Sequence, residues 1–498
     1  MKPLAVLLER LRTQGGLLQV LGTPRSDTIH HLTHDSRQIR PGGLFAALKG
    51  VATDGHLFID KAVQNGAVAI VCEVVPEDAL TRFPGTAFVH VRRTRREWTA
   101  MAAAFYDDPA EELRLVGVTG TNGKTTTTHL IYHILMAFDQ PTGLMGTIAN
   151  YIGTDIAPAT HTTPDAAEVH RLLRQMVDAG CTACVMEVSS HALEQGRVVG
   201  IAFDVAVFTN LTRDHLDYHG TFKEYLRAKK RLFDGLAPTA TALVNTDDPA
   251  ATEMIASTAA TVRTFGLQPD ADFGGQITAN QLDGLSMQVN QTAVKLQLVG
   301  AFNAYNALAA YGAVRVLGYE PPAIRAALST APPVAGRFEH RAYRGVTVIV
   351  DYAHTPDALE NVLVTTRELL QGQGRLWCVF GCGGDRDPTK RRTMGSLAER
   401  YADRVIVTSD NPRTEDPEAI LNDIRRGMEQ PRQAQWIVDR EAAIRAAAEG
   451  AQPGDAVLIA GKGHEAYQIV GQTRLPFDDR EMAARYFQDP RPPAPDAL

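Results

Sequence analysis

The sequence predicts an α/β protein of three domains: an N-terminal α/β domain, a central domain with a parallel sheet, and a C-terminal Rossmann-like domain. At 498 residues the chain is too long for a single hydrophobic core. Apolar strand-like runs alternate with amphipathic helical stretches, and this order favours a parallel sheet covered by helices. Shifts in the pattern place the domains at residues 1–97, 98–335 and 336–498.

The N-terminal segment mixes short helices and strands around a turn-rich centre at Pro41-Gly42-Gly43, which is typical of a small α/β domain. Its apolar run Leu4–Leu8 is followed directly by Glu9 and Arg10, so it is too short for the core of a signal peptide. No run of about 18 apolar residues occurs in the sequence. We therefore expect a cytoplasmic protein that does not insert into membranes.

Composition argues against several other classes of protein. Hydrophobic residues make up 44% and charged residues 21% of the chain, as in ordinary globular proteins. The net charge of −7 gives no field that would attract nucleic acid. The five cysteines form no disulfide framework. Cys181 and Cys184 make a C-x-x-C, but Cys184 opens an apolar run, so we interpret it as a buried strand residue.

The strongest motif of the central domain is a glycine-rich loop, Gly120-Thr121-Asn122-Gly123-Lys124-Thr125-Thr126, between a predicted strand and a predicted helix. Glycines let backbone amides turn toward phosphate oxygens, and the helix N-terminus adds positive potential. Lys124 would reach the β- and γ-phosphates, and the Thr125 hydroxyl would bind Mg²⁺. The strict motif has glycine where this chain has Val118, so the loop is a variant. It predicts binding of a nucleoside triphosphate.

Two further residues of this domain are candidate metal ligands. Glu187 lies in an apolar run, where an unpaired carboxylate is costly to bury. Either a bound cation or a buried ion pair would remove that cost. His215 follows another strand and lies between Asp214 and Asp217. Because Mg²⁺ prefers oxygen ligands, the residue chemistry alone leaves the role of His215 open.

The C-terminal domain contains four apolar runs that each end in a polar cluster. In open α/β sheets, ligands bind outside the carboxyl ends of the strands, so the clusters predict a ligand site on a Rossmann-like domain. The run and its cluster are, in order, Val346–Val350 with Asp351-Tyr352-Ala353-His354, Leu376–Phe380 with the residues 381–387, Arg404–Val407 with Asp410-Asn411-Pro412-Arg413, and Ala456–Ala460 with Gly461-Lys462-Gly463-His464-Glu465.

Six segments resemble the signatures of the Mur ligase family, in the family's order and spacing. They are GTNGKTTT (120–127), MEVSSHAL (186–193), TNLTRDHLDYHG (209–220), GAFNAYN (300–306), GRFE (336–339) and DYAHTPD (351–357). The resemblance covers essentially the whole chain. It implies an N-terminal domain that binds a UDP-linked precursor, a central domain that binds ATP, and a C-terminal domain that binds an amino acid. It also implies ATP-dependent formation of an amide through an acyl phosphate.

The resemblance implies roles for individual residues around ATP and Mg²⁺. The residues expected at ATP are Gly120, Thr121, Asn122, Gly123, Lys124, Thr125, Thr126, Asn303, Asn306, Arg337 and Asp351. The expected metal ligands are Thr125, Glu187, His215 and Lys229, and Lys229 matches a lysine that the family carries as a carbamate derived from CO₂. Lys124, Lys229 and His215 are the expected catalytic residues.

Simpler interpretations of some of these residues remain open. Lys230 competes with Lys229 by composition, and only the family register selects Lys229; both lysines could also lie on a solvated helix face. Asn303 and Asn306 could simply cap a helix.

The UDP-linked precursor is expected to bind the first two domains. By resemblance, the uridine nucleotide meets Ser36 and the segment Val51-Ala52-Thr53. The peptide arm is expected to meet Thr162, Thr163, Ser189, Gln195 and Arg197.

Within the family, the segments HTTP (161–164), DNPR (410–413) and GKGHE (461–465) resemble the member that adds meso-2,6-diaminopimelate to the D-glutamate γ-carboxylate of UDP-N-acetylmuramoyl-L-alanyl-D-glutamate in peptidoglycan synthesis. Diaminopimelate differs from lysine by one carboxylate, which Arg413 can bind with two parallel hydrogen bonds. The implied contacts of the amino acid are Arg386, Asp410, Asn411, Pro412, Arg413, Gly461 and Glu465.

Other activities remain alternatives. The same ligation with L-lysine, or another ligase of the superfamily such as folylpolyglutamate synthase, would use much of the same site. A different phosphate-loop ATPase or kinase would explain Lys124 and Thr125 but not the four polar clusters of the C-terminal domain. The expected partners are small molecules only, and we expect a monomer.

Overall fold

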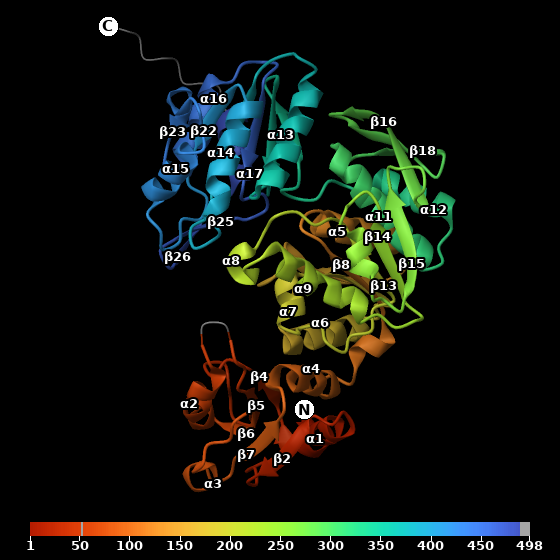
Figure 1. Ribbon diagram of the computed structural model, residues 1–498, viewed down its shortest axis with the longest axis vertical. Coiled ribbons are helices and arrows are strands. Elements are labelled where there is room, and N and C mark those ends of the chain that lie inside the picture. The colour runs from red at the N-terminus through yellow and green to blue at the C-terminus, as the bar shows by residue number, and fades with distance from the viewer. Residues whose placement is uncertain (51–52, 489–498) are drawn as a thin grey trace.

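The computed structural model of the protein describes residues 1–50 and 53–488. Three lobes lie in a row along its long axis, with the N-terminal lobe at one end and the C-terminal lobe at the other (Figure 1). Each lobe combines a sheet with covering helices, so the predicted three-domain α/β architecture is confirmed. No helix among the described residues has both the length and the apolar character that crossing a membrane requires.

The N-terminal lobe is built on a five-stranded sheet in the order β2-β7-β6-β5-β4. The strand β2 is antiparallel to β7, and the other pairs are parallel. The strands are β2 (Leu17–Leu21), β4 (His31–Thr33), β5 (Gly43–Ala46), β6 (Ala67–Cys72) and β7 (Ala87–Val91), with a small pair β1 (Lys2–Pro3) and β3 (Thr28–Ile29). The helices are α1 (Leu4–Thr13), α2 (Ile59–Gln64), α3 (Ala79–Arg82) and α4 (Thr94–Phe105).

The helix α4 corrects the first predicted domain boundary. Its residues Trp98, Met101 and Phe105 are buried in one core with Leu4 and Leu7 of α1. The boundary between residues 97 and 98 therefore falls inside a helix whose apolar face packs on the N-terminal lobe. The structure places the end of this domain after Phe105.

The central lobe contains an eleven-stranded sheet in the order β11-β10-β9-β12-β8-β13-β14-β15-β16-β17-β18. Strands from β9 to β16 in this order are parallel, and antiparallel hairpins extend both edges. The strands are β8 (Arg114–Thr119), β9 (Thr142–Met145), β10 (Ala149–Ile152), β11 (Asp155–Pro158), β12 (Ala183–Glu187), β13 (Val205–Phe208), β14 (Thr241–Asn245), β15 (Thr261–Gly266), β16 (Phe273–Gln281), β17 (Gly284–Val289) and β18 (Thr292–Leu296).

Helices cover both faces of this sheet, and two separate hydrophobic cores fill the spaces between them. The helices are α5 (Lys124–Met136), α6 (Ala166–Asp178), α7 (Ser190–Glu194), α8 (Leu216–His219), α9 (Phe222–Asp234), α10 (Ala251–Ile255), α11 (Ala301–Val316) and α12 (Pro321–Thr330). The middle strand β12 is buried at every residue, as expected for a parallel strand covered on both faces. Cys184 lies within it and is unpaired, which confirms the interpretation as a buried strand residue.

The C-terminal lobe has a six-stranded sheet in the order β19-β20-β24-β21-β22-β23. Only β19 is antiparallel, so the four strands that precede the polar clusters end at the same edge. The strands are β19 (Glu339–Tyr343), β20 (Val346–Asp351), β21 (Leu376–Phe380), β22 (Arg404–Val407), β23 (Gln435–Trp436) and β24 (Ala456–Ala460), followed by a hairpin of β25 (Tyr467–Val470) and β26 (Thr473–Pro476). The helices are α13 (Pro356–Leu370), α14 (Thr389–Tyr401), α15 (Pro417–Arg425), α16 (Arg440–Gly450) and α17 (Asp479–Gln488).

A fully buried ion pair joins α16 to α17. The Arg440 guanidinium donates to both carboxylate oxygens of Asp479, at 2.7 and 2.8 Å, and neither side chain is exposed. Arg440 also donates to the carbonyl oxygens of Ser409 and Ala460, which directly precede two polar clusters. The pair therefore supports the edge of the sheet at which the clusters lie.

We expect the Asp479→Asn variant to lower the free energy of unfolding of this lobe by about 3–5 kcal/mol, the usual cost of removing one partner of a buried ion pair. The amide would leave the buried Arg440 charge without its counter-ion. Denaturant unfolding measures the change, and Glu449→Gln is the matched control because Glu449 pairs with Arg445 on the exposed side of the same helix. Equal stability of the two variants would contradict this account.

Candidate active site

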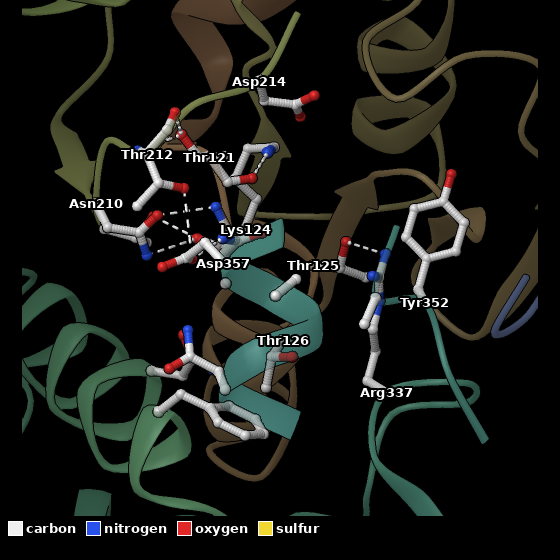
Figure 2. Close-up of a pocket in the computed structure, with 18 of the residues that line it drawn as sticks. Thr121, Lys124, Thr125, Thr126, Asn210, Thr212, Asp214, Arg337, Tyr352 and Asp357 are labelled. Atoms are coloured by element: carbon white, nitrogen blue, oxygen red, sulfur yellow. Dashed lines mark hydrogen bonds between the residues drawn. The ribbon is translucent and has the colours of Figure 1, made fainter. Parts of the chain in front are cut away.

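A cavity of about 460 Å³ lies between the central and C-terminal lobes. The strands β8, β12, β13 and β14 are parallel neighbours, and the segments that follow their carboxyl ends reach it. This is the edge at which open α/β sheets bind ligands. Its lining includes Thr121, Asn122, Gly123, Lys124, Thr125, Thr126, Thr162, Glu187, Ser189, His215, Lys229, Asn306, Arg337 and Asp351. Figure 2 shows the phosphate-loop residues Thr121, Lys124, Thr125 and Thr126 among them.

The phosphate loop lies between β8 and α5, as predicted. Gly123 directly precedes α5 with φ of 86°, and a Cβ atom there would lie 2.4 Å from the Asn306 side-chain oxygen. A Cβ on Gly120 would lie 1.9 Å from the Thr209 hydroxyl oxygen. Both positions therefore require glycine. The Lys124 Nζ donates to the carbonyl oxygens of Gly120 and Thr121, at 2.9 and 2.8 Å, so the cation lies over the loop.

Glu187, at the end of β12, is fully buried. Its carboxylate accepts hydrogen bonds from the Thr125 hydroxyl at 3.0 Å and from the backbone and hydroxyl of Thr147 at 2.8 and 3.0 Å. Within residues 1–50 and 53–488 no basic side chain forms an ion pair with it, so the buried ion pair considered from the sequence is not formed. A hydroxyl and a carboxylate oxygen 3.0 Å apart match the oxygen ligands that Mg²⁺ prefers.

The structure separates the two adjacent lysines of α9. Lys229 is 1% exposed, and its Nζ donates to the Gly120 carbonyl oxygen at 2.6 Å. Lys124 donates to the same oxygen, so two amines share one acceptor. Burial, and then the charge of Lys124, lowers the pKa of Lys229 well below its ordinary value. Lys230 instead pairs with Asp234 away from the cavity.

The neutral amine of Lys229 is the form that adds CO₂. A carbamate there would place anionic oxygens in the cavity that Thr125 and Glu187, the candidate ligands of a first metal ion, also line. The donor set therefore fits the second metal site that the family implies.

His215 precedes α8 with φ of 54°. Its Nε2 lies 3.3 Å from the Asp214 carboxylate, and its ring contacts the ring of His191 at 4.8 Å between centroids. Burial lowers the pKa of His215 below its ordinary value, which favours the neutral imidazole, the form that can bind a metal through a ring nitrogen. Among the described residues, no three His, Cys, Asp or Glu side chains form a ready metal cluster.

Asn306 and Asn303 have different roles in the structure. Asn306 lines the cavity and accepts a hydrogen bond from the Thr127 hydroxyl. Asn303 lies behind it, where its amide donates to the Val299 carbonyl at 2.7 Å and its oxygen accepts from Asn306 at 2.9 Å. Gly300 caps α11, so neither asparagine is the helix cap considered from the sequence. Asn303 orients Asn306 and is not part of the described lining.

Arg337 and Asp351 bring the C-terminal lobe to the phosphate loop. The Arg337 guanidinium donates to the Thr125 hydroxyl at 3.1 Å and lies 4.4 Å from the centre of the Tyr352 ring (Figure 2). Asp351 accepts from the backbone amides of Phe338 and Ala353, at 2.6 and 2.7 Å. These bonds fix the backbone next to Arg337 and after β20, two segments of the C-terminal lobe that line the cavity.

Sequence reasoning missed several residues that line the same cavity. Asp357, at the start of α13, accepts from the Asn122 side chain at 2.8 Å and thereby contacts the phosphate loop across the lobe interface. Its position within the DYAHTPD segment was the available signal. The aromatic residues Phe302 and Tyr305 also line the cavity, next to the two asparagines of α11.

A second cavity of about 290 Å³ lies between the N-terminal and central lobes. Thr53, Gln195 and Arg197 line it, as the predicted binding of the UDP-linked precursor requires. Ser36 is buried outside this lining, and its carbonyl accepts from Asn65. The predicted residues Val51 and Ala52 lie outside the described part of the chain.

Hydrogen bonds connect the two cavities through the residues predicted for the peptide arm. Arg197 donates to the Thr163 carbonyl at 2.6 Å, and the Thr163 hydroxyl donates to the Glu187 carbonyl at 2.7 Å. The Thr163 hydroxyl also accepts from the backbone amide of Ser189 at 3.0 Å. Thr162 lines the first cavity, 3.1 Å from the Thr147 hydroxyl. The arrangement provides a polar path from one cavity to the other.

The residues predicted for the amino acid converge at the ends of β22 and β24. Asn411 donates to the Glu465 carboxylate at 2.9 Å, and a Cβ on Gly461 would lie 2.5 Å from an Asp410 carboxylate oxygen. The fully buried Lys462, which sequence reasoning left out of the site, lies 3.3 Å from Glu465. Glu465 therefore already has one cationic partner within the protein.

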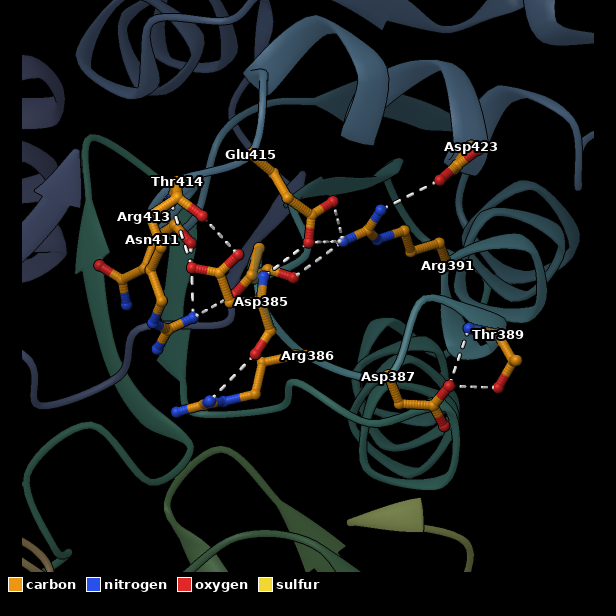
Figure 3. Close-up of polar contacts among 12 residues, drawn as sticks. Asp385, Arg386, Asp387, Thr389, Arg391, Asn411, Arg413, Thr414, Glu415 and Asp423 are labelled. Carbon is orange, nitrogen blue, oxygen red and sulfur yellow. Dashed lines mark hydrogen bonds and ion pairs between the residues drawn. The ribbon is translucent and has the colours of Figure 1, made fainter. Parts of the chain in front are cut away.

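Arg413 and Arg386 lie close to each other, on the loops that follow β22 and β21 (Figure 3). The Arg413 guanidinium donates to the carbonyl oxygens of Gly384 and Asn411, at 2.8 and 3.5 Å. In the described part of the chain no carboxylate forms an ion pair with it. An arginine held only by carbonyl oxygens retains its charge for a carboxylate ligand.

Three family models match the chain. They are "Mur ligase family, catalytic domain" over residues 28–106, "Mur ligase middle domain" over 118–314 and "Mur ligase, glutamate ligase domain" over 336–463.

Similar proteins are named UDP-N-acetylmuramoyl-L-alanyl-D-glutamate–2,6-diaminopimelate ligase. The protein of Phocaeicola vulgatus is 46% identical, over 93% of this chain and 96% of its own. That of Geobacillus kaustophilus is 47% identical, over 91% of this chain and 93% of its own. A solved structure with the same name is 36% identical, covers 92% of this chain and 94% of its own, and has a TM-score of 0.61.

More distant structures share the fold alone. MurF from Acinetobacter baumannii is 20% identical with a TM-score of 0.64, and covers 93% of this chain and 96% of its own. Folylpolyglutamate synthase from Mycobacterium tuberculosis is also 20% identical, with a TM-score of 0.61, and covers 74% of this chain and 92% of its own.

Proposed function

Since the chain belongs to the Mur ligase family and is thus an ATP-dependent amide-forming ligase, we propose that it adds meso-2,6-diaminopimelate to the D-glutamate γ-carboxylate of UDP-N-acetylmuramoyl-L-alanyl-D-glutamate. The observation that carries this proposal is Arg413, a half-buried guanidinium without a carboxylate partner in the described chain, beside the Asp410–Glu465 cluster. The names of relatives at 46–47% identity support the same substrate. The enzyme acts as a monomer in the cytoplasm.

The reaction proceeds in two steps. The γ-carboxylate oxygen attacks the γ-phosphorus of ATP, and the bond to ADP breaks, giving an acyl phosphate. A neutral amine of diaminopimelate then attacks the acyl carbon and loses one proton, and phosphate leaves as the amide forms. Lys124 and the loop amides stabilise the transferred phosphate, while Arg337 adds a second positive charge across the lobe interface.

The cavity also has ligands for the metal ions of the proposed reaction. Thr125 and Glu187 would hold one Mg²⁺, and His215 with a carbamylated Lys229 would hold a second. When bound, the ions neutralise phosphate charge. Carbamylation joins the neutral Lys229 amine to CO₂ and releases one proton, and the lowered pKa of this amine favours the reaction.

The lobes align the substrates. The precursor would extend from the second cavity past Thr163 and Ser189, so that its γ-carboxylate reaches the phosphate loop. The amino acid would lie between the DNPR cluster and this loop. The Asn122–Asp357 hydrogen bond closes the interface on the ATP side and helps to exclude water from the acyl phosphate.

The test is phosphate release from the purified protein with ATP, Mg²⁺ and the UDP-linked dipeptide, with either meso-diaminopimelate or L-lysine added. We expect efficient release only with diaminopimelate and weak release at high concentrations of lysine, because lysine would leave Arg413 unpaired. Turnover with lysine instead would keep the family but contradict the assigned amino acid. Release without any amino acid would indicate an ATPase.

A further inference from the structure

Two loops that carry residues of the amino-acid cluster are joined to each other directly. The first follows β21 and the second follows β22. The Gly384 amide donates to the Asn411 carbonyl at 2.9 Å, and the Arg413 guanidinium returns a bond to the Gly384 carbonyl at 2.8 Å. A Cβ on Gly384 would lie 1.9 Å from the Pro412 carbonyl oxygen, so the loops are in close contact.

A second layer of polar contacts lies behind Arg413. The Asp385 carboxylate accepts from the hydroxyl and the backbone amide of Thr414, at 2.8 and 3.2 Å. The Asp385 amide in turn donates to the Glu415 carboxylate at 2.6 Å. Arg413 and Asp385 both have φ of 53°, which non-glycine residues keep only where surrounding contacts hold them. These contacts fix the backbone conformation of both loops.

Arg391 anchors this layer from the buried side (Figure 3). It lies on α14 with 2% exposure, and its guanidinium donates to both carboxylate oxygens of Glu415, at 2.9 and 2.8 Å. Its other terminal nitrogen donates to Asp423 of α15 at 3.0 Å. Glu415 thus joins a buried cation to the backbone of the first loop. Neither Arg391 nor Glu415 is among the residues assigned to a substrate.

We propose that Arg391 and Glu415 are positioning residues that fix the Arg413 guanidinium and thereby set the preference for an amino acid with a second carboxylate. The proposal rests on the function proposed above. Binding two carboxylate oxygens with parallel hydrogen bonds requires the guanidinium in one orientation, and small displacements weaken such contacts strongly. Lysine does not use Arg413, so its binding does not depend on the Arg391–Glu415 pair.

The test is steady-state kinetics of the full-length Arg391→Lys and Glu415→Gln variants. For Arg391→Lys we expect KM for diaminopimelate to rise about tenfold, with kcat and KM for ATP within about twofold of the parent enzyme. Glu415→Gln keeps the shape of the side chain and an acceptor for the Asp385 amide, so its KM for diaminopimelate should rise about threefold. The weak turnover with lysine at high concentration should stay unchanged in both variants.

The matched control is Arg426→Ala. Arg426 pairs with the same Asp423 carboxylate at 2.9 Å, but it lies on the exposed side and does not reach Glu415. Its kinetic constants should remain within about twofold of the parent values, as for other exposed ion pairs. If Arg391→Lys does not fold, Glu415→Gln alone tests the proposal, because it alters no buried volume.

The outcomes distinguish this proposal from the assigned function. A parent enzyme that prefers diaminopimelate, with variants whose KM for diaminopimelate is unchanged, overturns the positioning role only. Variants that lose kcat, ATP binding and lysine turnover by the same factor also overturn it, because they indicate general structural damage. A parent enzyme that does not turn over diaminopimelate overturns both.

Discussion

The Lys229→Ala enzyme is expected to lose ligation by about three orders of magnitude, the scale seen when an electrostatic group is removed from an active site. Lys229 is buried against the phosphate loop, and alanine would leave neither an amine nor a carbamate there. The measurement is phosphate release at saturating concentrations of all three substrates.

Two neighbouring changes show whether the carbamate is responsible. Lys230→Ala should retain activity within a few-fold, because Lys230 pairs with Asp234 away from the cavity. Lys229→Arg keeps a positive charge but cannot add CO₂, so it should be as inactive as alanine. A short carboxylic acid such as formate should restore part of the activity of Lys229→Ala. An active Lys229→Arg enzyme would contradict the carbamate.

The same account predicts a dependence on CO₂ and pH. Burial lowers the pKa of Lys229, so its amine stays neutral to lower pH than that of a free lysine. Enzyme depleted of CO₂ should lose activity and regain it with bicarbonate. The recovery should become slower as the pH falls through the lowered pKa, because protonation removes the nucleophile.

The parts of the site that the sequence predicted are those set by local order along the chain. A strand that runs into a glycine-rich loop and a helix is visible in consecutive residues, and so are the polar clusters after β20, β21, β22 and β24. Because these strands pair in parallel, the ends that carry the polar clusters lie at the same edge of the sheet. The three-domain architecture followed from the same alternation of strands and helices.

The sequence left open which side of a helix faces the cavity and how deeply a given side chain is buried. Lys229 and Lys230 are adjacent, and only the packing of α9 decides which one faces Gly120. Asn303 and Asn306 lie on the same face of α11, yet one forms the cavity wall and the other lies behind it. The boundary near residue 97 failed because an amphipathic helix can pack on either neighbouring domain.

The pairing of residues far apart in the chain could not be predicted from the sequence, even where one partner lies in a recognisable segment, as Asp357 does. Arg391 and Glu415 are 24 residues apart, and Asn122 and Asp357 are 235 residues apart. Nothing in the spacing of such pairs distinguishes them from ordinary surface charges. Their roles follow only from the way the loops of different strands meet.

Arg413→Asn is expected to lower kcat/KM for diaminopimelate by about 10²- to 10³-fold, the cost of removing one partner of a desolvated charge pair. Asparagine tolerates the left-handed backbone, with φ of 53° at this position, better than alanine does. The variant therefore removes the guanidinium with little backbone strain. Steady-state kinetics with diaminopimelate and with lysine measures the effect.

The ratio of kcat/KM for diaminopimelate to kcat/KM for lysine should fall by the same factor of about 10² to 10³, because lysine has no second carboxylate for Arg413 to bind. Arg344→Asn is the matched control: Arg344 also has a positive φ, of 50°, and among the described residues its side chain donates hydrogen bonds to the carbonyl oxygens of Tyr486 and Phe487 near the end of α17. It should keep both activities. If Arg413→Asn lowers turnover with lysine as strongly as with diaminopimelate, Arg413 maintains the loop and another group selects the amino acid. A loss of activity with diaminopimelate alone would show that the Arg413 guanidinium distinguishes diaminopimelate from lysine.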